Sequence, residues 1–325
     1  SSSLCRQRST CRPSCSPESA PPESQVGKKR SAKSQSSVAD AHPHTRHAAV
    51  NAVALSIGTV LLYSPAFWFD FVLLDDPTYV VTNQHVLGGL TLPNIVWAFT
   101  YFSKGNWIPL TWLSYMVDVS IGGTSAGMFH VTNVVLHSAN VVLLFGLLLR
   151  LTTSLWKSAV VAALFAVHPV HVESVAWVTE RKDVLSTFFA LLSLHLYVRY
   201  VARTRWSTYA GVAACLVLSL MAKPMMVTLP VLLLLVDVWP LHRWRFGGNA
   251  QWRALVIEKL PLFGIAIAFG VLAIATQRRG GAFADSTALP LGPRLGFAVL
   301  GYGAYLRRLV WPAGLNALYA FPEPL

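Results

Sequence analysis

Two neighbouring carboxylates stand in a polar stretch that follows the first apolar run of the chain. They are Asp75 and Asp76, in the sequence Leu74-Asp75-Asp76-Pro77. Adjacent carboxylates repel each other and resist removal from water, so one can act as a general base, or both can hold a cation or orient a hydroxyl. The structural alternative is a plain turn, because Asp-Pro is common in turns. We take the pair as the first candidate for chemistry.

A second group of ionisable residues lies where one apolar run ends and the next begins. It contains His168, His171 and Glu173, followed by Arg181 and Lys182. Two histidines and a carboxylate can bind a metal, but this spacing fits no strong zinc signature, and a divalent cation is left open. A guanidinium fork beside a lysine point charge suits a phosphate better. The structural alternative is that these residues cap two helix ends at the level of the lipid headgroups.

Further polar groups stand at later ends of apolar runs. Lys223 precedes a proline, Gln277 precedes Arg278 and Arg279, and Arg294 lies beyond them. A lysine at such a point can extend to lipid headgroups or hold a lipid-linked phosphate. The stretch after Gln277 is typical either of an anion site or of a flexible basic loop.

The elements that must position these residues are membrane-spanning helices. The sequence is 54% hydrophobic and only 12% charged, whereas soluble domains carry about 25% charged residues. A span needs about 20 apolar residues. The candidate runs are 48–67, 131–149, 158–172, 184–200, 207–222, 225–240, 254–276 and 295–311. The last run carries Arg307 and Arg308, so it is predicted either to cross the membrane or to lie flat on it.

The stretches between and before these runs differ in kind. Residues 1–47 are rich in Ser, Pro, Lys and Arg, which predicts a disordered cytoplasmic tail. Residues 68–129 are too polar to span, and we expect one large structured loop there, with a short amphipathic helix near 92–101. The sequence thus predicts an all-α, polytopic membrane helix bundle over residues 48–325, with about seven or eight spans. Aromatic residues of the loop, among them Trp68, Trp97 and Trp112, are expected to form a belt at the membrane surface.

Charge predicts which way the bundle faces. With the N-terminus inside, seventeen Lys and Arg lie in the tail and inner loops, against seven outside, as the positive-inside rule requires. The net charge of +12 is therefore explained without a nucleic-acid partner. Eight of the fourteen acidic residues lie on the outer side. Because orientation does not depend on acids, the mixed outer cluster indicates a site.

Several longer motifs carry a family resemblance that covers about residues 49–323. They are Asp75-Asp76-Pro77-x-Tyr79-Val80, His130-x-Thr132-Asn133, His168-Pro169-x-His171-Val172-Glu173-Ser174-Val175-Ala176-Trp177, Glu180-Arg181-Lys182-Asp183, Lys223-Pro224, Trp239-Pro240-Leu241 and Gln277 with Gly280-Gly281-Ala282. In these motifs the chain resembles the transmembrane and tetratricopeptide-repeat protein O-mannosyltransferases. The resemblance implies the C-type glycosyltransferase fold, with its site on the luminal or periplasmic side.

The resemblance also implies an activity. Such enzymes move mannose from dolichyl-phosphate-mannose to Ser or Thr hydroxyls of proteins, and their tetratricopeptide repeats would be expected beyond residue 325. The family site in the first outer loop falls on Asp75 and Asp76. By charge and position we predict that the donor phosphate binds a cationic set, with further site candidates nearby. The cationic set is Arg181, Lys182, Lys223 and Arg294, and the further candidates are His168, His171, Glu173 and Gln277.

Two other functions compete with this one. The chain could be a non-catalytic membrane scaffold whose repeats bind partners. A lipid or sugar transporter would need polar residues through the bilayer midplane, and the runs 225–236 and 260–276 offer almost none. The expected partners are a polyprenyl- or dolichyl-phosphate sugar, a protein acceptor and the bilayer. The expected location is a bacterial cytoplasmic membrane, or the endoplasmic reticulum membrane in a eukaryote.

Overall fold

The computed structural model describes residues 41–102, 105–244, 249–281 and 291–316. Within these ranges the chain is helical and contains no β-strand. Residues 50–325 form one compact unit, and the account below concerns that unit. Of the other unit, residues 1–49, the predicted tail lies outside the described residues except for its last few positions, which are helical.

The helices follow the predicted apolar runs. The α-helices are α2 (Ala41–Tyr63), α3 (Gln84–Leu87), α4 (Leu92–Thr100), α5 (Pro109–Gly122), α6 (Ala126–Thr152), α7 (Leu155–Val167), α8 (Val172–Ala176), α9 (Arg181–Ala202), α10 (Trp206–Ala222), α11 (Leu229–Val238), α12 (Asn249–Arg279) and α13 (Leu291–Val310). Short turns of 3-10 or π-helix join them: η1 (Ser64–Trp68), η2 (Pro77–Val81), η3 (Pro169–His171), η4 (Val178–Glu180) and η5 (Pro224–Thr228). The predicted amphipathic helix is α4.

Four of these helices are long and apolar enough to cross a membrane. They cover Arg46–Trp68, Ala126–Thr152, Val178–Ala202 and Ala250–Arg279, while three shorter apolar helices cover Leu155–Val167, Trp206–Ala222 and Pro224–Val238. The protein is therefore an all-α, polytopic integral membrane protein. The total of seven or eight spans stays a prediction. Among the described residues α13 does not qualify as a span, and none of its side chains is buried.

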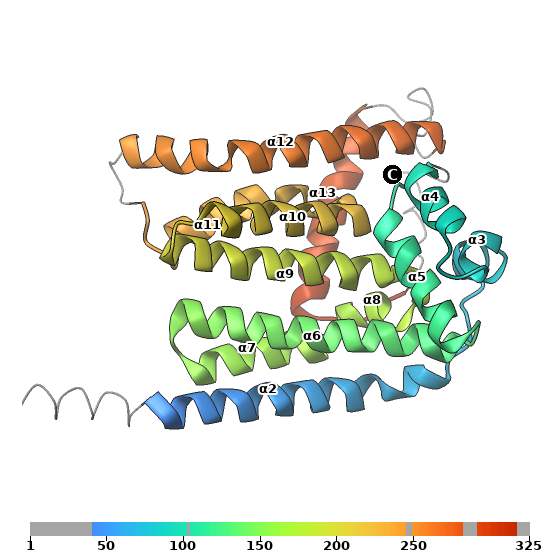
Figure 1. Ribbon diagram of the computed structural model, residues 1–325, viewed down its shortest axis with the longest axis horizontal. Helices are drawn as coiled ribbons and strands as arrows, with labels where there is room; N and C mark the ends of the chain where they lie inside the picture. The colour runs from blue at the N-terminus through green and yellow to red at the C-terminus, as the bar shows by residue number, and fades with distance from the viewer. Residues whose placement is uncertain (1–40, 103–104, 245–248, 282–290, 317–325) are drawn as a thin grey trace, which may run out of the picture. The chain divides into compact units, whose positions relative to one another are not determined.

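The long helices run side by side, and a smaller helical lobe gathers at one end of them. Figure 1 shows α6, α9, α10 and α12 alongside one another, with α3, α4 and α5 together at the end where α6 begins. Polar side chains on α6 join it to its neighbours. The Asn140 amide donates to the Val184 carbonyl at 2.8 Å, and His137 Nε2 lies 3.3 Å from the Ala166 carbonyl.

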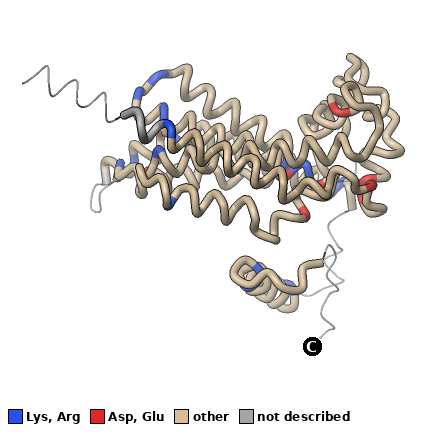
Figure 2. Tube along the Cα trace, turned by 90° about the horizontal axis from the view of Figure 1, so that it is seen from below, with Lys and Arg blue, Asp and Glu red and all other residues tan. Residues whose placement is uncertain are grey.

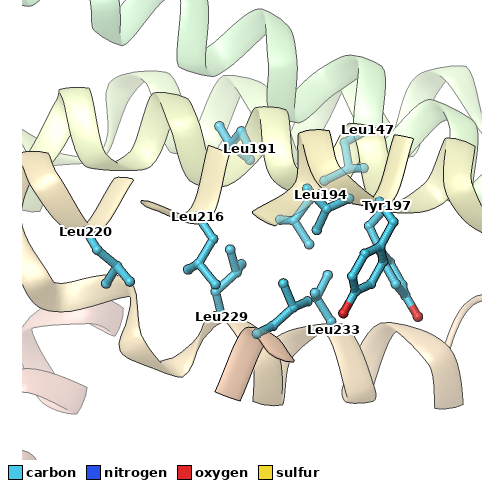
Figure 3. Packing of buried hydrophobic residues seen from close by; sticks show 11 residues of the cluster. Leu147, Leu191, Leu194, Tyr197, Leu216, Leu220, Leu229 and Leu233 are labelled. Atoms are coloured by element: carbon cyan, nitrogen blue, oxygen red, sulfur yellow. The ribbon is translucent and has the colours of Figure 1, made fainter. Parts of the chain in front are cut away.

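Leucines from α9, α10 and α11 form the main core. Leu216, Leu220 and Leu233 are fully buried and belong to one cluster with Leu191 and Leu194 of α9 (Figure 3). Because lipid tails are as apolar as leucine, van der Waals packing of these side chains, and not their removal from water, holds the three helices together.

The lobe formed by residues 69–122 has a core of its own, and that core is aromatic. The Trp112 ring stacks on Tyr79 with centroids 4.9 Å apart, and Trp97 lies between His85 and Tyr101, 4.5 Å from each. Trp112 is buried, whereas Trp68 is 79% exposed. The expectation of one surface belt is therefore wrong for Trp112, because its ring fills the interior of the lobe.

Charge is unevenly distributed along the bundle. Figure 2 shows many of the Lys and Arg at one end and others farther along the chain, while most of the visible Asp and Glu lie toward the other end. The basic end also holds a buried network. There the Asp237 carboxylate pairs with Lys259 and, at 3.0 Å, with Arg243, while Arg243 and Lys259 both pair with Glu258 at 2.9 Å. Because Asp237 and Lys259 are both fully buried, this network joins α11 to α12.

One backbone contact fixes where the lobe begins. A side chain at Gly127, in the first turn of α6, would place its Cβ 2.7 Å from the carbonyl oxygen of Phe67 in η1. That distance is too short for a methyl group, so glycine lets α6 and η1 meet backbone to backbone.

Candidate active site

The two predicted carboxylates occupy opposite environments. Asp76 is fully buried. Its Oδ1 accepts from the Trp177 indole and the Thr179 amide, each at 3.0 Å, and from the Thr179 hydroxyl, while its Oδ2 accepts from the Val72 amide at 2.8 Å. Asp76 thus ties the first loop to residues 177–179. Its four donors leave it no room to take a proton from a substrate.

Asp75, by contrast, is exposed. Its backbone carbonyl accepts from the amides of Thr78 and Tyr79, both at 3.0 Å, which holds the residue at the start of the η2 turn. Within the described residues its carboxylate has no hydrogen-bond or ion-pair partner. Of the two, Asp75 has the carboxylate that is open to an incoming hydroxyl.

Two of the predicted phosphate-binding cations belong to a charged cluster, formed by Glu180, Lys182, Asp183 and Lys223. Lys223 Nζ lies 2.5 Å from Asp183 and 3.3 Å from Glu180, and Lys182 Nζ lies 2.9 Å from Glu180. Burial alone would lower the pKa of Lys223, but the carboxylates of Asp183 and Glu180 outweigh it and raise the pKa overall. The cluster therefore keeps Lys223 charged, with 28% of its side chain exposed.

Arg181 is placed differently from these lysines. It is fully buried and forms an ion pair with Asp118. Its Nε donates to Asn133 Oδ1 and its Nη2 to the Phe129 carbonyl, both at 2.7 Å. A guanidinium so enclosed has no surface to offer a phosphate.

An apolar groove lies beside the carboxylate pair, with a volume of about 800 Å³. One side comes from Phe69 and Val72 of the first loop and from a second stretch, Pro169, Val170, Val172, Glu173, Ala176 and Trp177. The other side comes from Tyr302, Leu306 and neighbouring residues of α13. Trp177 lines this groove and donates its indole N–H to Asp76. Trp177 therefore connects the groove directly to the loop that carries Asp75 and Asp76.

The groove has few charged groups in its lining. These are Glu173 and Arg308. Burial raises the pKa of Glu173, and the carboxylates of Glu180 and Asp183 raise it further. The groove thus combines an apolar lining with one acidic and one basic group.

The predicted histidines lie next to groove-lining residues in the sequence, but neither His168 nor His171 lines the groove itself. The rings of His168 and His171 are 6.0 Å apart. His168 Nδ1 accepts from the Val170 amide at 3.3 Å, so its Nε2 carries the proton and donates to the Leu309 carbonyl of α13 at 2.9 Å. Within the described ranges no three His, Cys, Asp or Glu residues are placed to hold a metal ion. His168 instead holds α13 against η3.

The remaining two candidates lie away from the groove. Gln277 is half-buried near the end of α12, where its side chain lies against Gly105. Arg294 lies in the first turn of α13 and is not part of the groove lining. Three residues that sequence reasoning did not select have a place in the site: Trp177, Thr179 and Arg308. Trp177 stood in a quoted motif, but nothing local in the sequence pairs it with a carboxylate 101 residues earlier.

The chain has recognisable relatives, although no family model and no solved structure matches it. Protein O-mannosyl-transferase TMTC2 of Mus musculus is 30% identical over 204 residues, 56% of this chain and 23% of that protein. The Xenopus laevis protein O-mannosyl-transferase tmtc2 is 30% identical over 247 residues, 67% of this chain and 28% of its own length. Human protein O-mannosyl-transferase TMTC4 is 33% identical over 169 residues, 45% of this chain and 22% of that protein.

The chain thus spans less than a third of the length of each of these relatives. The similarity nevertheless extends over about half or more of this chain for several proteins that share one name. The chain is accordingly similar, over about half of its length or more, to TMTC proteins that are named protein O-mannosyl-transferases.

Proposed function

We propose that this protein is a membrane glycosyltransferase of the C-type fold. In this proposal it moves a sugar from a polyprenyl- or dolichyl-phosphate donor to a Ser or Thr hydroxyl of a protein, on the extracytoplasmic side. Mannose is the sugar that the names of its relatives favour. The observation that carries the proposal is an exposed carboxylate, Asp75, in the loop that lines an apolar groove.

The groove suits the donor lipid. An isoprenoid chain needs an apolar channel, and aromatic and aliphatic side chains line this one. The phosphate needs a cation. Arg308 lies in the lining, and Lys182 and Lys223 lie in the charged cluster near Glu173, which is also in the lining. We therefore assign the phosphate to these three cations, in place of Arg181 and Arg294.

The reaction follows from these positions. Asp75 accepts the proton of the acceptor hydroxyl as that oxygen bonds to the anomeric carbon. The bond from the anomeric carbon to the phosphate oxygen breaks, and the polyprenyl phosphate leaves with the electron pair. Attack in line with the leaving group inverts the anomeric centre. The protonated Asp75 then loses its proton to water.

The orientation belongs to the same proposal. The many Lys and Arg at one end of the bundle (Figure 2) favour that end as cytoplasmic, because such residues are enriched in cytoplasmic loops. The carboxylate loop and the groove would then face the periplasm or the lumen of the endoplasmic reticulum. On this view residues 48–325 are the membrane domain of the enzyme.

The test compares Asp75→Asn with wild type, in membranes given dolichyl-phosphate-mannose and a Ser/Thr-rich acceptor peptide. Loss of a general base costs about 10²–10⁴-fold in rate, and we expect transfer to fall by that factor while the protein still folds. The matched control is Asp70→Asn, the same change at another exposed carboxylate of the loop. Equal transfer by Asp75→Asn and wild type would refute the assignment. If a variant with both Asp75 and Asp76 changed to Asn fully restored the function of cells that lack the protein, a non-catalytic scaffold would be favoured.

A further inference from the structure

Residues 175–180, here called the bridge segment, are held along both edges of their backbone. On one edge the Thr179 amide and the Trp177 indole donate to Asp76. On the other edge the Tyr115 hydroxyl lies 3.1 Å from the Val178 carbonyl and 3.2 Å from the Thr179 carbonyl. The segment is therefore fixed between the carboxylate loop and helix α5.

A second side chain binds the same carbonyl edge. Asn133 Nδ2 donates to the carbonyls of Val175, at 3.3 Å, and Trp177, at 3.1 Å. Its amide must present nitrogen to these carbonyls, and its Oδ1 must then find a donor of its own. Arg181 supplies that donor at 2.7 Å.

Arg181 thus supports both side chains that hold the carbonyl edge. Besides its bond to Asn133, its guanidinium lies over the Tyr115 ring, 4.7 Å from the centroid. Its charge is balanced by Asp118, whose Oδ1 accepts from the Thr132 hydroxyl at 2.8 Å. Burial raises the pKa of Asp118 overall, although Arg181 and Thr132 lower it in part.

We infer that Arg181, paired with Asp118, is a positioning residue that fixes the bridge segment through Asn133 and Tyr115. Through that segment it sets the place of Asp76 and Trp177 at the groove. This inference deepens the function proposed above and rests on it for its catalytic consequence. It gives a role to a guanidinium that is too enclosed to bind the donor.

The planar shape of the guanidinium is what the site uses. Arg181 directs separate N–H groups at Asn133, the Phe129 carbonyl and Asp118, and its flat face lies over Tyr115. Lysine carries the same charge but is a point charge on a flexible stem and cannot reproduce this fork. Arg181→Lys therefore separates positioning from charge.

Hydrogen exchange measured by mass spectrometry tests the inference without any need for activity. In Arg181→Lys we expect the amides of peptides covering 172–180 to exchange about tenfold faster, because their hydrogen-bonded frame opens more often. Peptides from the middle of α10 should be unchanged. The matched control is Arg199→Lys, the same substitution at an exposed position of the same helix, and it should leave the bridge segment as protected as in wild type.

Kinetics supply the second readout. If Arg181 positions the site, Arg181→Lys lowers kcat by about tenfold or more and leaves the KM for the dolichyl-phosphate donor unchanged, whereas loss of a donor ligand would raise that KM. Tyr115→Phe keeps the ring and removes the two bonds to the carbonyls. Tyr115→Phe should show the same faster exchange in residues 172–180, and it tests the inference even if Arg181→Lys fails to fold.

The outcomes separate the two proposals. Wild-type exchange in the bridge segment of Arg181→Lys or of Tyr115→Phe would overturn the positioning role, as would a raised donor KM at constant kcat. If the exchange pattern appears as expected but wild-type protein transfers no sugar, the positioning role stands and the proposed function fails.

Discussion

Replacing Asp76 by Asn tests whether Asp76 has a structural role, in contrast to the catalytic role proposed for Asp75. The change is nearly isosteric, but one carboxylate oxygen becomes an NH2 group. If that group takes the place of Oδ2, it faces the Val72 amide, which is itself a donor and now lies 2.8 Å from Oδ2. That bond is lost, and the Val72 N–H is left unsatisfied in a buried place. The three bonds to Oδ1 also lose their charge assistance.

The expected cost follows from these bonds. Hydrogen bonds to charged groups contribute about 1.5–3 kcal/mol each, and an unsatisfied buried group costs about 1–3 kcal/mol. We expect Asp76→Asn to lower the free energy of unfolding by about 3 kcal/mol. At about 2–4 °C per kcal/mol, the melting temperature should fall by about 6–12 °C. The melting temperature is measured by thermal unfolding in detergent, with tryptophan fluorescence as the signal.

The control is Asp75→Asn in the same assay. Because the Asp75 carboxylate is exposed and has no partner among the described residues, its loss should change stability by no more than about 0.5 kcal/mol. The reasoning fails if Asp76→Asn melts with wild type, or if Asp75→Asn loses as much stability as Asp76→Asn.

Two further predictions concern the rest of the unit. Lys259→Met leaves the Asp237 carboxylate buried without its lysine, and thermal unfolding should show a loss of about 3–5 kcal/mol. In the double variant Lys259→Met with Asp237→Leu, part of that loss should be recovered. His171 should make stability depend on pH, since burial lowers its pKa and the nearby His168 lowers it further. The stability that neutral His171 contributes is present above the ordinary pKa of about 6.5 and is lost as the pH falls below it. In His171→Phe the melting temperature should therefore change less with pH between about pH 7 and 5.

Each of these has an outcome that would contradict it. For Lys259, the exposed residue Arg253 is the comparison, because Arg253→Met should cost almost nothing. A similar loss in both variants would show that Met, and not the missing charge, is responsible. For His171, an unchanged pH dependence in the phenylalanine variant would show that another group titrates in that range.

Hydropathy predicted the long helices because a run of about 20 apolar residues is a local property of the sequence. Helices α6, α9 and α12 were found this way. Boundaries were harder. The run predicted at 225–240 is divided into η5 and α11, with Pro224 at the start of the one and Pro230 at the start of the other. Proline is tolerated in the first turn of a helix but interrupts its interior.

The site was predictable as a region but not as a set of roles. Asp75 and Asp76 are chemically identical neighbours, and only the fold buries one of them against Trp177 and Thr179. Arg181 resembled a phosphate ligand because it precedes Lys182. Its partner Asp118 lies 63 positions earlier, and no local pattern reveals such a pair. The groove was invisible to sequence analysis because it needs α13 beside η3 and α8.

The contact at Gly127 limits how far Asp75 can travel. Because α6 and η1 touch backbone to backbone at Phe67, the loop that carries the carboxylate has a fixed starting point. Asp75 lies eight positions after Phe67, and a fully extended chain of eight residues reaches no more than about 29 Å. Asp75 therefore cannot move farther than this distance from Phe67. An acceptor hydroxyl must therefore bind within about that distance of the first turn of α6. The acceptor protein has to reach Asp75, because the loop that carries Asp75 cannot extend to a distant acceptor.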